Sequence, residues 1–470
     1  MKKKLWTVLF FLFSIVIVIN KGFSQNALDR YVAEPDSVYA WKLINTIEGK
    51  GYKSYILELT SQTWRKPSEV DKTVWKHWIN IIKPDKITTN KALLYIAGGG
   101  NSTPAPTKTS PTSAMLALES NAVIVELGMV PNQPLRFSDS KDVERTEDDL
   151  IAYTYNKMAD TKDPYWLVRL AMVKSGVRAM DAVQEFLKSD AGGKTIVDEF
   201  VVMGGSKRGW TTWLVGAVDK RVVAIMPAVI DALNTDATTV HHYEVYGFFS
   251  EALNDYVNHG IIPHLVNKEA NRAVMELDDP YYYRNRERLK IPKYVMNASG
   301  DQYFLPDNSH YYFKGLQSPK YLRYVPNTKH NLGDSDAYQT LLAFFQAIIN
   351  QRTLPTMSWK IKKNGNIVMK TSETPKEINV WTATNPKARD FRLDVIGKAF
   401  KKTNLPVNTK NKYVALAPKP EKGYAAFYIE MVFENGKFPL KFTSEVSVVP
   451  NVTLYKFEDS YNQYADKRRK

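Results

Sequence analysis

The chain of 470 residues contains no cysteine and has only seven histidines. The absence of cysteine excludes disulfides, a lipoprotein anchor, cysteine metal ligands and cysteine nucleophiles. The H-E-x-x-H pattern of zinc peptidases is also absent. His241 and His242 are adjacent, so their side chains diverge in a strand or a helix. We interpret them as residues of a cap near a cleft, and we expect neither a metal nor another cofactor.

Long apolar runs are missing after the N-terminal segment. That segment has three lysines at residues 2–4, an apolar run over 5–19 and small residues before position 25. This pattern is typical of a signal peptide, residues 1–24, with cleavage after Ser24. An uncleaved anchor is the alternative. Export without disulfides is typical of a bacterial envelope, so we expect a periplasmic or extracellular protein with no membrane span after cleavage.

Charge of one sign is not concentrated in any folded segment. The formal net charge is +15, and removing the four lysines of residues 1–24 leaves +11. The basic residues are scattered apart from the tail 467–470. No nucleic-acid-binding motif occurs, so nucleic acid is not an expected partner. The apolar share of 44% and the length are ordinary for a soluble chain with room for two domains.

Strand and helix patterns alternate along the chain as far as about residue 350. Short apolar runs predict strands at 92–97, 121–127, 200–203, 222–230, 294–298 and 321–325, and helical spacing predicts helices at 147–159, 166–187 and 337–350. Such alternation predicts a mainly parallel sheet covered by helices on both faces. We assign this domain to residues 25–353, with a helical cap inserted at about 232–290.

The pattern changes after residue 354. Segments of alternating polarity predict short strands at 367–370, 377–383, 391–395, 413–417, 425–433 and 445–449. Asn364-Gly365 and Asn435-Gly436 are strong hairpin signals. We therefore predict a small all-β sandwich of the fibronectin or immunoglobulin kind over residues 354–470.

One tight turn lies between a buried strand and a helix, with Ser206 at its apex. The order of strand, glycine-rich turn, serine and helix is that of the nucleophile elbow of α/β-hydrolases. The usual pattern is G-x-S-x-G, but Arg208 stands where the last glycine belongs and Gly209 comes one place later. The alternative is a structural Gly-Gly turn with no chemical role.

The other parts of a serine hydrolase occur in the order that the fold requires. His330 follows the last predicted strand and precedes the final helix, which is where this fold places its base. Asp301 ends the preceding strand and is our choice for the acid, with Asp307 as the alternative. A histidine on a surface loop is the competing interpretation of His330.

A glycine run after the first clear strand predicts an oxyanion hole. Backbone N–H groups near Gly99 and Gly100, together with the N–H of Lys207, would face the negative charge that develops on the carbonyl oxygen. Asn101, Lys207 and Arg208 are candidate substrate-binding residues. For the two bases the alternative is a salt bridge that fixes the elbow, and the acids of residues 145–149 are interpreted as a charged helix start.

With these residues placed, the chain resembles the PhoPQ-activated pathogenicity-related proteins, which include the autocrine proliferation repressor proteins. The matching segments are 59–65, 98–101, 130–134, 145–150, 178–181, 205–210, 301–307 and 325–327 with His330. The elbow is also similar to the G-x-S-x-x-G elbow of glucuronoyl esterases, where a basic residue follows the serine. The resemblance implies an α/β-hydrolase fold and makes Arg208 a family trait.

These observations predict a secreted serine hydrolase that cleaves an ester or amide bond through an acyl-enzyme intermediate. Its expected partner is a small-molecule, glycan-ester or peptide substrate. Two alternatives remain: a peptidase that acts on peptides, and a catalytically silent hydrolase-like protein that binds or signals.

Overall fold

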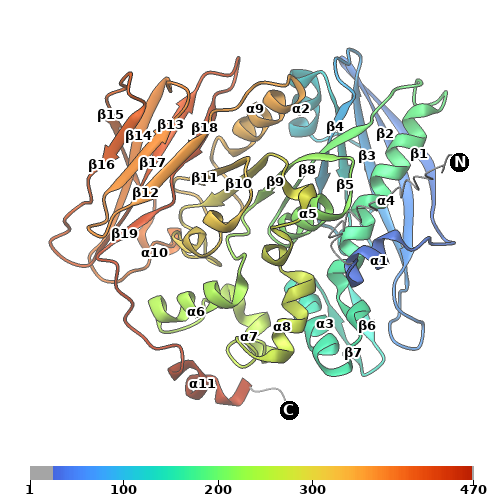
Figure 1. The fold of residues 1–470 in the computed structure, drawn as a ribbon. Helices are drawn as coiled ribbons and strands as arrows, with labels where there is room; N and C mark the ends of the chain where they lie inside the picture. Colours follow the sequence, from blue (N-terminus) through green and yellow to red (C-terminus); the bar gives the residue numbers. More distant parts are fainter. Residues whose placement is uncertain (1–24, 468–470) are drawn as a thin grey trace, which may run out of the picture.

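A nine-stranded sheet forms the centre of the computed structural model, which describes residues 25–467 (Figure 1). Its strands follow the order β1-β2-β3-β5-β4-β8-β9-β10-β11. Their bounds are β1 Ala40–Gly49, β2 Tyr52–Thr63, β3 Val74–Pro84, β4 Lys91–Ile96, β5 Val123–Leu127, β8 Glu199–Gly205, β9 Val222–Ala228, β10 Lys293–Ala298 and β11 Lys320–Val325. The predicted signal peptide lies outside the described residues.

The neighbouring strands β5, β4, β8, β9, β10 and β11 run parallel, as predicted. The N-terminal edge of the sheet, from β1 to the pairing of β3 with β5, is antiparallel. No strand was predicted before residue 92, so the sequence did not reveal β1, β2 and β3. Polar residues interrupt their apolar pattern: Glu58 of β2 pairs across the sheet with Lys42 and Lys76. A half-exposed antiparallel edge lacks the continuous apolar run that marks the buried parallel strands.

Helices cover both faces of the sheet, and the side chains of each strand alternate between two cores. On one face, Leu94 packs in a core cluster with residues of α4 (Val168–Lys188) and α5 (Lys207–Val218). On the other face, Leu93 packs with residues of α2 (Pro111–Ser120) and α9 (Ala337–Ile349). This two-layered covering explains why these strands are apolar on both sides.

A helical cap follows β9, where it was predicted. It comprises α6 (Thr235–Tyr246), α7 (Asn254–Asn258) and α8 (Glu269–Asp278), which lie at the lower end of the molecule beside α3 (Glu147–Thr161) (Figure 1). The short helix α1 (Ala27–Ala33) lies against α4, and the small hairpin of β6 (Leu135–Phe137) and β7 (Ser140–Arg145) precedes α3. Within residues 25–467, no helix is both long and apolar enough to span a membrane.

Two antiparallel sheets follow α9. One holds β12 (Met357–Ile361), β13 (Ile367–Thr371) and β16 (Lys412–Ala415); the other holds β14 (Glu377–Asn385), β15 (Lys401–Leu405), β17 (Tyr424–Phe433), β18 (Leu440–Thr443) and β19 (Ser447–Val449). Asn364-Gly365 joins β12 to β13 and Asn435-Gly436 joins β17 to β18, with positive φ at both glycines. Both hairpin signals are confirmed.

The predicted strand at 391–395 is wrong. These residues form a turn and the short helix α10 (Leu393–Ile396), in which the N–H of Leu393 donates to the carbonyl of Gly300. The segment therefore closes over the loop after β10 instead of pairing with a neighbouring strand. Phe391 is buried in the core whereas Val395 is half exposed, so the alternation that predicted a strand here does not correspond to one buried face.

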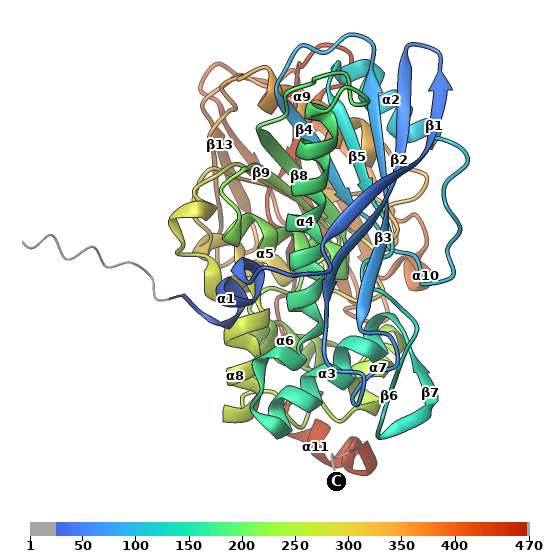
Figure 2. The ribbon, with the colours of Figure 1, turned by 90° about the vertical axis from the view of Figure 1, so that its right-hand side faces the viewer.

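The end of the chain leaves the β sheets and reaches the cap. Residues after 450 lead to α11 (Asp459–Gln463), which lies beside the cap in both views (Figures 1 and 2). The hydroxyl of Tyr464 accepts from the N–H of Phe249, and the hydroxyl of Tyr243 donates to Gln463 at 2.6 Å. The C-terminal segment thus ties the β sheets to the cap.

Candidate active site

Ser206 occupies a strained turn between β8 and α5. Its φ of 56° and ψ of −127° lie in a region that costs a non-glycine residue about 1–3 kcal/mol. The backbone N–H of Ser206 donates to the carbonyl of Ala228 at the end of β9, at 2.9 Å. The neighbouring strand therefore holds the serine in this conformation at the carboxyl edge of the sheet.

The glycines at 204 and 209 are required by the close approach of β8 and α5. A Cβ on Gly204 would lie 2.6 Å from the carbonyl oxygen of Arg208, and a Cβ on Gly209 would lie 2.8 Å from that of Ala228. Real Cβ atoms do not approach this closely. The spacing G-x-S-x-x-G therefore reflects which residue of α5 meets the sheet, and position 208 faces elsewhere.

The side chain of Arg208 reaches away from the sheet into a polar network. Its Nε donates to the carbonyl of Val130 at 2.6 Å, and both Nη atoms bind the carboxylate of Glu147 at 2.8 and 2.6 Å. Lys207 Nζ binds Glu147 at 2.9 Å and Asp148 at 3.3 Å. Both bases beside the serine are paired with the start of α3, which is the salt-bridge alternative considered for them.

Glu147 links the elbow to the glycine loop after β4. Burial alone would raise the pKa of its carboxyl group, but the hydrogen bonds and charge of Arg208, together with Lys207, lower it to about 2. The same carboxylate accepts from Gln133 Nε2 at 2.5 Å, and Gln133 Nε2 also donates to the carbonyl of Gly99 at 3.1 Å. One carboxylate thus connects the two segments that were expected to form the oxyanion hole.

The glycine loop packs directly against the elbow. A Cβ on Gly98 would lie 2.9 Å from Arg208 Nη2, so a larger residue here would force the guanidinium to shift. The N–H of Gly100 donates to the Thr103 hydroxyl at 2.9 Å, and the Asn101 amide donates to the carbonyl of Pro134 at 2.9 Å. The N–H of Gly100 is therefore engaged within the loop, and the Asn101 amide is engaged by the segment just before β6.

His330 and Asp301 lie together on the loops that follow β11 and β10. His330 Nδ1 is 2.8 Å from Asp301 Oδ2 and 3.1 Å from Oδ1. The N–H of Tyr303 also donates to Asp301, at 2.8 Å, which fixes the carboxylate. Within the described part of the chain, the buried Nε2 of His330 has no hydrogen-bond partner.

Asp307, the alternative acid, lies with a different histidine. Its carboxylate is 3.1 Å from His241 Nε2 and 2.5 Å from Arg389 Nη2. Burial would raise the pKa of Asp307, but the charges of His241 and Arg389 hold it far below its usual range. Asp301 is thus the carboxylate that contacts His330.

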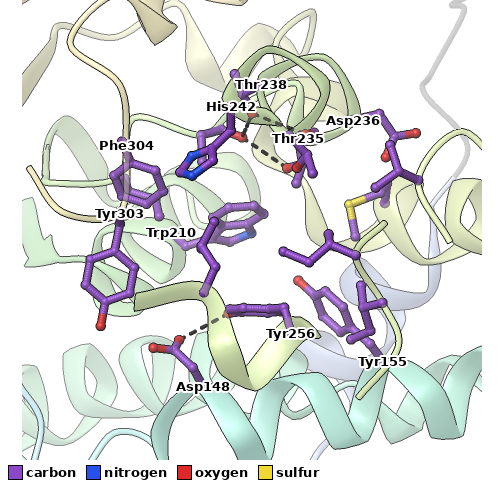
Figure 3. Close-up of a pocket in the computed structure, with 18 of the residues that line it drawn as sticks. Asp148, Tyr155, Trp210, Thr235, Asp236, Thr238, His242, Tyr256, Tyr303 and Phe304 are labelled. Atoms are coloured by element: carbon purple, nitrogen blue, oxygen red, sulfur yellow. Dashed lines mark hydrogen bonds between the residues drawn. The ribbon is translucent and has the colours of Figure 1, made fainter. Parts of the chain in front are cut away.

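A cavity of about 110 Å³ opens beside Ser206, between the elbow and the cap. Figure 3 shows Trp210 at its centre, with Tyr303 and Phe304 on one side and Tyr155 and Tyr256 on the other. The ring of Tyr303 lies against His330, with centroids 4.4 Å apart and an angle of 39° between the ring planes. Because Tyr303 and Ser206 line the same cavity, His330 contacts a residue of the cavity wall.

Sequence reasoning missed most of this cavity and the role of Glu147. Glu147 and Asp148 were interpreted as a helix start, which α3 confirms, but they also pair with the bases of the elbow. The adjacent acids Glu147 and Asp148 and the adjacent bases Lys207 and Arg208 could have indicated this pairing. Tyr303 and Phe304 come two and three residues after Asp301, and that proximity was the only sign in the sequence that they line the site.

The strand order and the elbow define an α/β-hydrolase fold. The chain belongs to the PhoPQ-activated pathogenicity-related protein family, whose model matches residues 28–392. It is similar to autocrine proliferation repressor protein A of Dictyostelium discoideum, with 38% identity over 93% of each chain.

Solved structures with a similar fold are esterases and peptidases. Acetyl xylan esterase 1 from Thermoanaerobacterium matches 68% of this chain and 92% of its own, with 14% identity and a TM-score of 0.46. A glucuronoyl esterase from Solibacter usitatus matches 67% of this chain and 87% of its own, with 13% identity and a TM-score of 0.40. Acylaminoacyl peptidase from Pyrococcus horikoshii matches 66% of this chain and 50% of its own, with 12% identity and a TM-score of 0.41.

Proposed function

We propose that this protein is a serine hydrolase that cleaves an ester or amide bond with Ser206, His330 and Asp301 as its triad. One observation carries the proposal: the imidazole of His330 is bound to a carboxylate through Nδ1, its Nε2 has no hydrogen-bond partner among the described residues, and its ring lies 4.4 Å, centroid to centroid, from Tyr303 in the wall of the cavity that the strained serine lines. This is the arrangement that a general base needs before substrate binds.

In the proposed first step, Ser206 Oγ attacks the carbonyl carbon while His330 Nε2 takes the hydroxyl proton. Asp301 keeps the other proton on Nδ1 and stabilises the imidazolium that forms. His330 then gives its proton to the leaving oxygen or nitrogen as the carbonyl bond to that atom breaks. Water attacks the acyl-enzyme in the same way, which releases the acid and returns the proton to Ser206.

The proposed oxyanion hole consists of the N–H groups of Lys207 and Gly99. Lys207 begins α5, and the first N–H groups of a helix have no partner within it. Gly99 has a φ of +122°, and its carbonyl is held by Gln133. Gly100 is the weaker candidate because its N–H already binds Thr103.

Export to the periplasm or the extracellular space is part of the proposal. It rests on the basic and apolar pattern of residues 1–24. N-terminal sequencing of the mature protein tests it: we expect the chain to begin at Gln25. A mature chain that retains its first residues would contradict cleavage.

Labelling with a fluorophosphonate probe tests the hydrolase proposal. We expect the probe on Ser206, no labelling of Ser206→Ala, and a loss of kcat on the order of a millionfold in that variant. Ser102→Ala, an exposed serine beyond the glycine loop, is the matched control and keeps both properties. If Ser206 stays unlabelled while a known serine hydrolase reacts, the proposal is wrong.

A further inference from the structure

The cavity beside Ser206 has an apolar middle. Side chains from the core and from the cap meet there, and those that carry the argument are Trp210, Ile230, Phe304, Leu253, Ile262 and Met275. Figure 3 shows aromatic rings on opposite sides of the open space. An apolar wall of this kind favours apolar groups, because they lose little hydration free energy when they leave water.

The charged side chains that line the cavity are already paired. Lys207 binds Glu147 and Asp148, and Asp148 also accepts from the hydroxyl of Tyr256 at 3.1 Å. Arg169 binds Asp278 at 3.3 Å and donates to the carbonyl of Lys207 at 2.8 Å. A substrate carboxylate would have to displace one of these partners in order to bind a cation here.

The polar groups contributed by α6 and its neighbours are also neutral or engaged. Asp236 accepts from Asn271 at 2.7 Å. His242 accepts from the N–H of Ser250 through Nε2 at 3.1 Å, and burial lowers its pKa to about 3, so the ring is uncharged at neutral pH. The cap therefore offers no free positive charge from His242.

We propose that this cavity receives a small, uncharged, apolar substituent next to the scissile carbonyl and rejects a substituent that carries a carboxylate. This proposal rests on the hydrolase function and specifies its substrate class. The volume of about 110 Å³ suits a branched aliphatic group, since it is smaller than the cavity of roughly 150 Å³ that holds benzene. A carboxylate there is disfavoured because an unpaired charge loses its hydration.

Two sets of esters locate the substituent and test its charge. In the first set the acyl group varies: 4-nitrophenyl acetate, isobutyrate and hydrogen glutarate, corrected for spontaneous hydrolysis. In the second set the alcohol varies: methyl, isobutyl and carboxymethyl acetate. In one of the two sets we expect kcat/KM for the branched ester to exceed that of the smallest by about tenfold or more, since added methylene groups in an apolar pocket give this discrimination. The carboxylate ester of that set should be the poorest.

Variants at the partly buried Leu253 test whether the cavity causes the preference. Leu253→Trp fills the space, so we expect it to remove the advantage of the branched ester over the smallest one. Leu253→Ala enlarges the space and should favour a phenyl-bearing ester. Leu265→Ala is the matched control: it is a partly buried leucine of the same cap that does not line the cavity, and it should keep the native ratio.

The outcomes separate this inference from the proposed function. Failure of the fluorophosphonate to label Ser206, with no turnover of any ester, would overturn both. Labelling and turnover with equal or greater activity on the carboxylate esters would overturn the inference alone. A branched-ester preference that Leu253→Trp leaves intact would also overturn it, because the preference would then arise elsewhere.

Discussion

Two histidine–aspartate pairs take their carboxylates from the loop that follows β10, and they differ in what else binds the carboxylate. Asp301 accepts from the neutral N–H of Tyr303, whereas Asp307 is also bound by the guanidinium of Arg389. His330 uses Nδ1 for its aspartate, while His241 uses Nε2. Histidine and aspartate are thus paired in two different ways, through Nδ1 in one pair and through Nε2 in the other.

The difference shows how a catalytic candidate is told apart from a structural tie. A carboxylate that faces a single imidazole can stabilise the charge which that ring gains during proton transfer. Asp307 is already neutralised by Arg389, and the three residues His241, Asp307 and Arg389 join α6, the loop after β10 and the C-terminal segment around residue 389. We interpret His241–Asp307 as a clamp for the cap and His330–Asp301 as the working pair.

Replacing the acid of the working pair should have the largest effect. Asp301→Asn keeps the shape but favours the wrong tautomer of His330, so we expect kcat to fall about ten-thousandfold with little change in Tm. Steady-state kinetics and thermal unfolding measure the two quantities. A variant that loses less than tenfold would remove Asp301 from the proposed triad.

Replacing the acid of the clamp should damage stability rather than chemistry. Asp307→Asn leaves Arg389 buried without its counter-charge, and breaking such a buried pair typically costs about 3–5 kcal/mol. We expect a lower Tm and a kcat within about tenfold of the native value under conditions where the variant is folded. The comparison of the two pairs fails if Asp307→Asn abolishes kcat in a protein of native Tm.

Glu147→Gln should have an intermediate effect on rate. Glu147 holds Arg208, Lys207 and Gln133, so its loss loosens both sides of the proposed oxyanion hole, and displacements of about 1 Å can cost about a hundredfold. We expect kcat to fall by up to that factor while KM changes little. Glu144→Gln, at an exposed ion pair with Arg136, is the control and should match the native enzyme. A fall in both variants would point to surface charge instead.

The smallest effect concerns Asp231, a third buried carboxylate near both pairs. Burial raises its pKa to about 8, with the charges of Asp301 and Asp307 adding to the shift. Because the folded pKa lies above the unfolded one, the stability contribution is present below about pH 4 and is lost as the pH rises toward 8. Asp231→Asn should therefore gain in Tm relative to the native chain between pH 5 and 8.

Thermal unfolding of both chains at pH 5, 7 and 9 measures this difference. The exposed Asp190→Asn is the control, and it should show no such trend. If the difference in Tm does not change with pH, Asp231 does not titrate with the raised pKa.

Much of the fold could be predicted because its strands are buried on both faces. β4, β8 and β10 are short apolar runs, and each is followed by a residue of the candidate site. The antiparallel edge and the strand predicted at 391–395 could not be resolved in this way. Their alternation of polar and apolar residues depends on which face meets the core, and only packing decides that.

The amino-acid sequence was enough to predict the elbow, the order of serine, acid and histidine, and the glycine loop, because these depend on local chain geometry and on the order of the strands. Two features required the folded structure: Asp301, and not Asp307, contacts His330, and both Lys207 and Arg208 pair with Glu147. The partners in these pairs and in Asp307–Arg389 lie 29 to 82 residues apart, and they are selected by loop packing rather than by local pattern. The cavity beside Ser206 also required the folded structure, since its walls come from the cap and the core together.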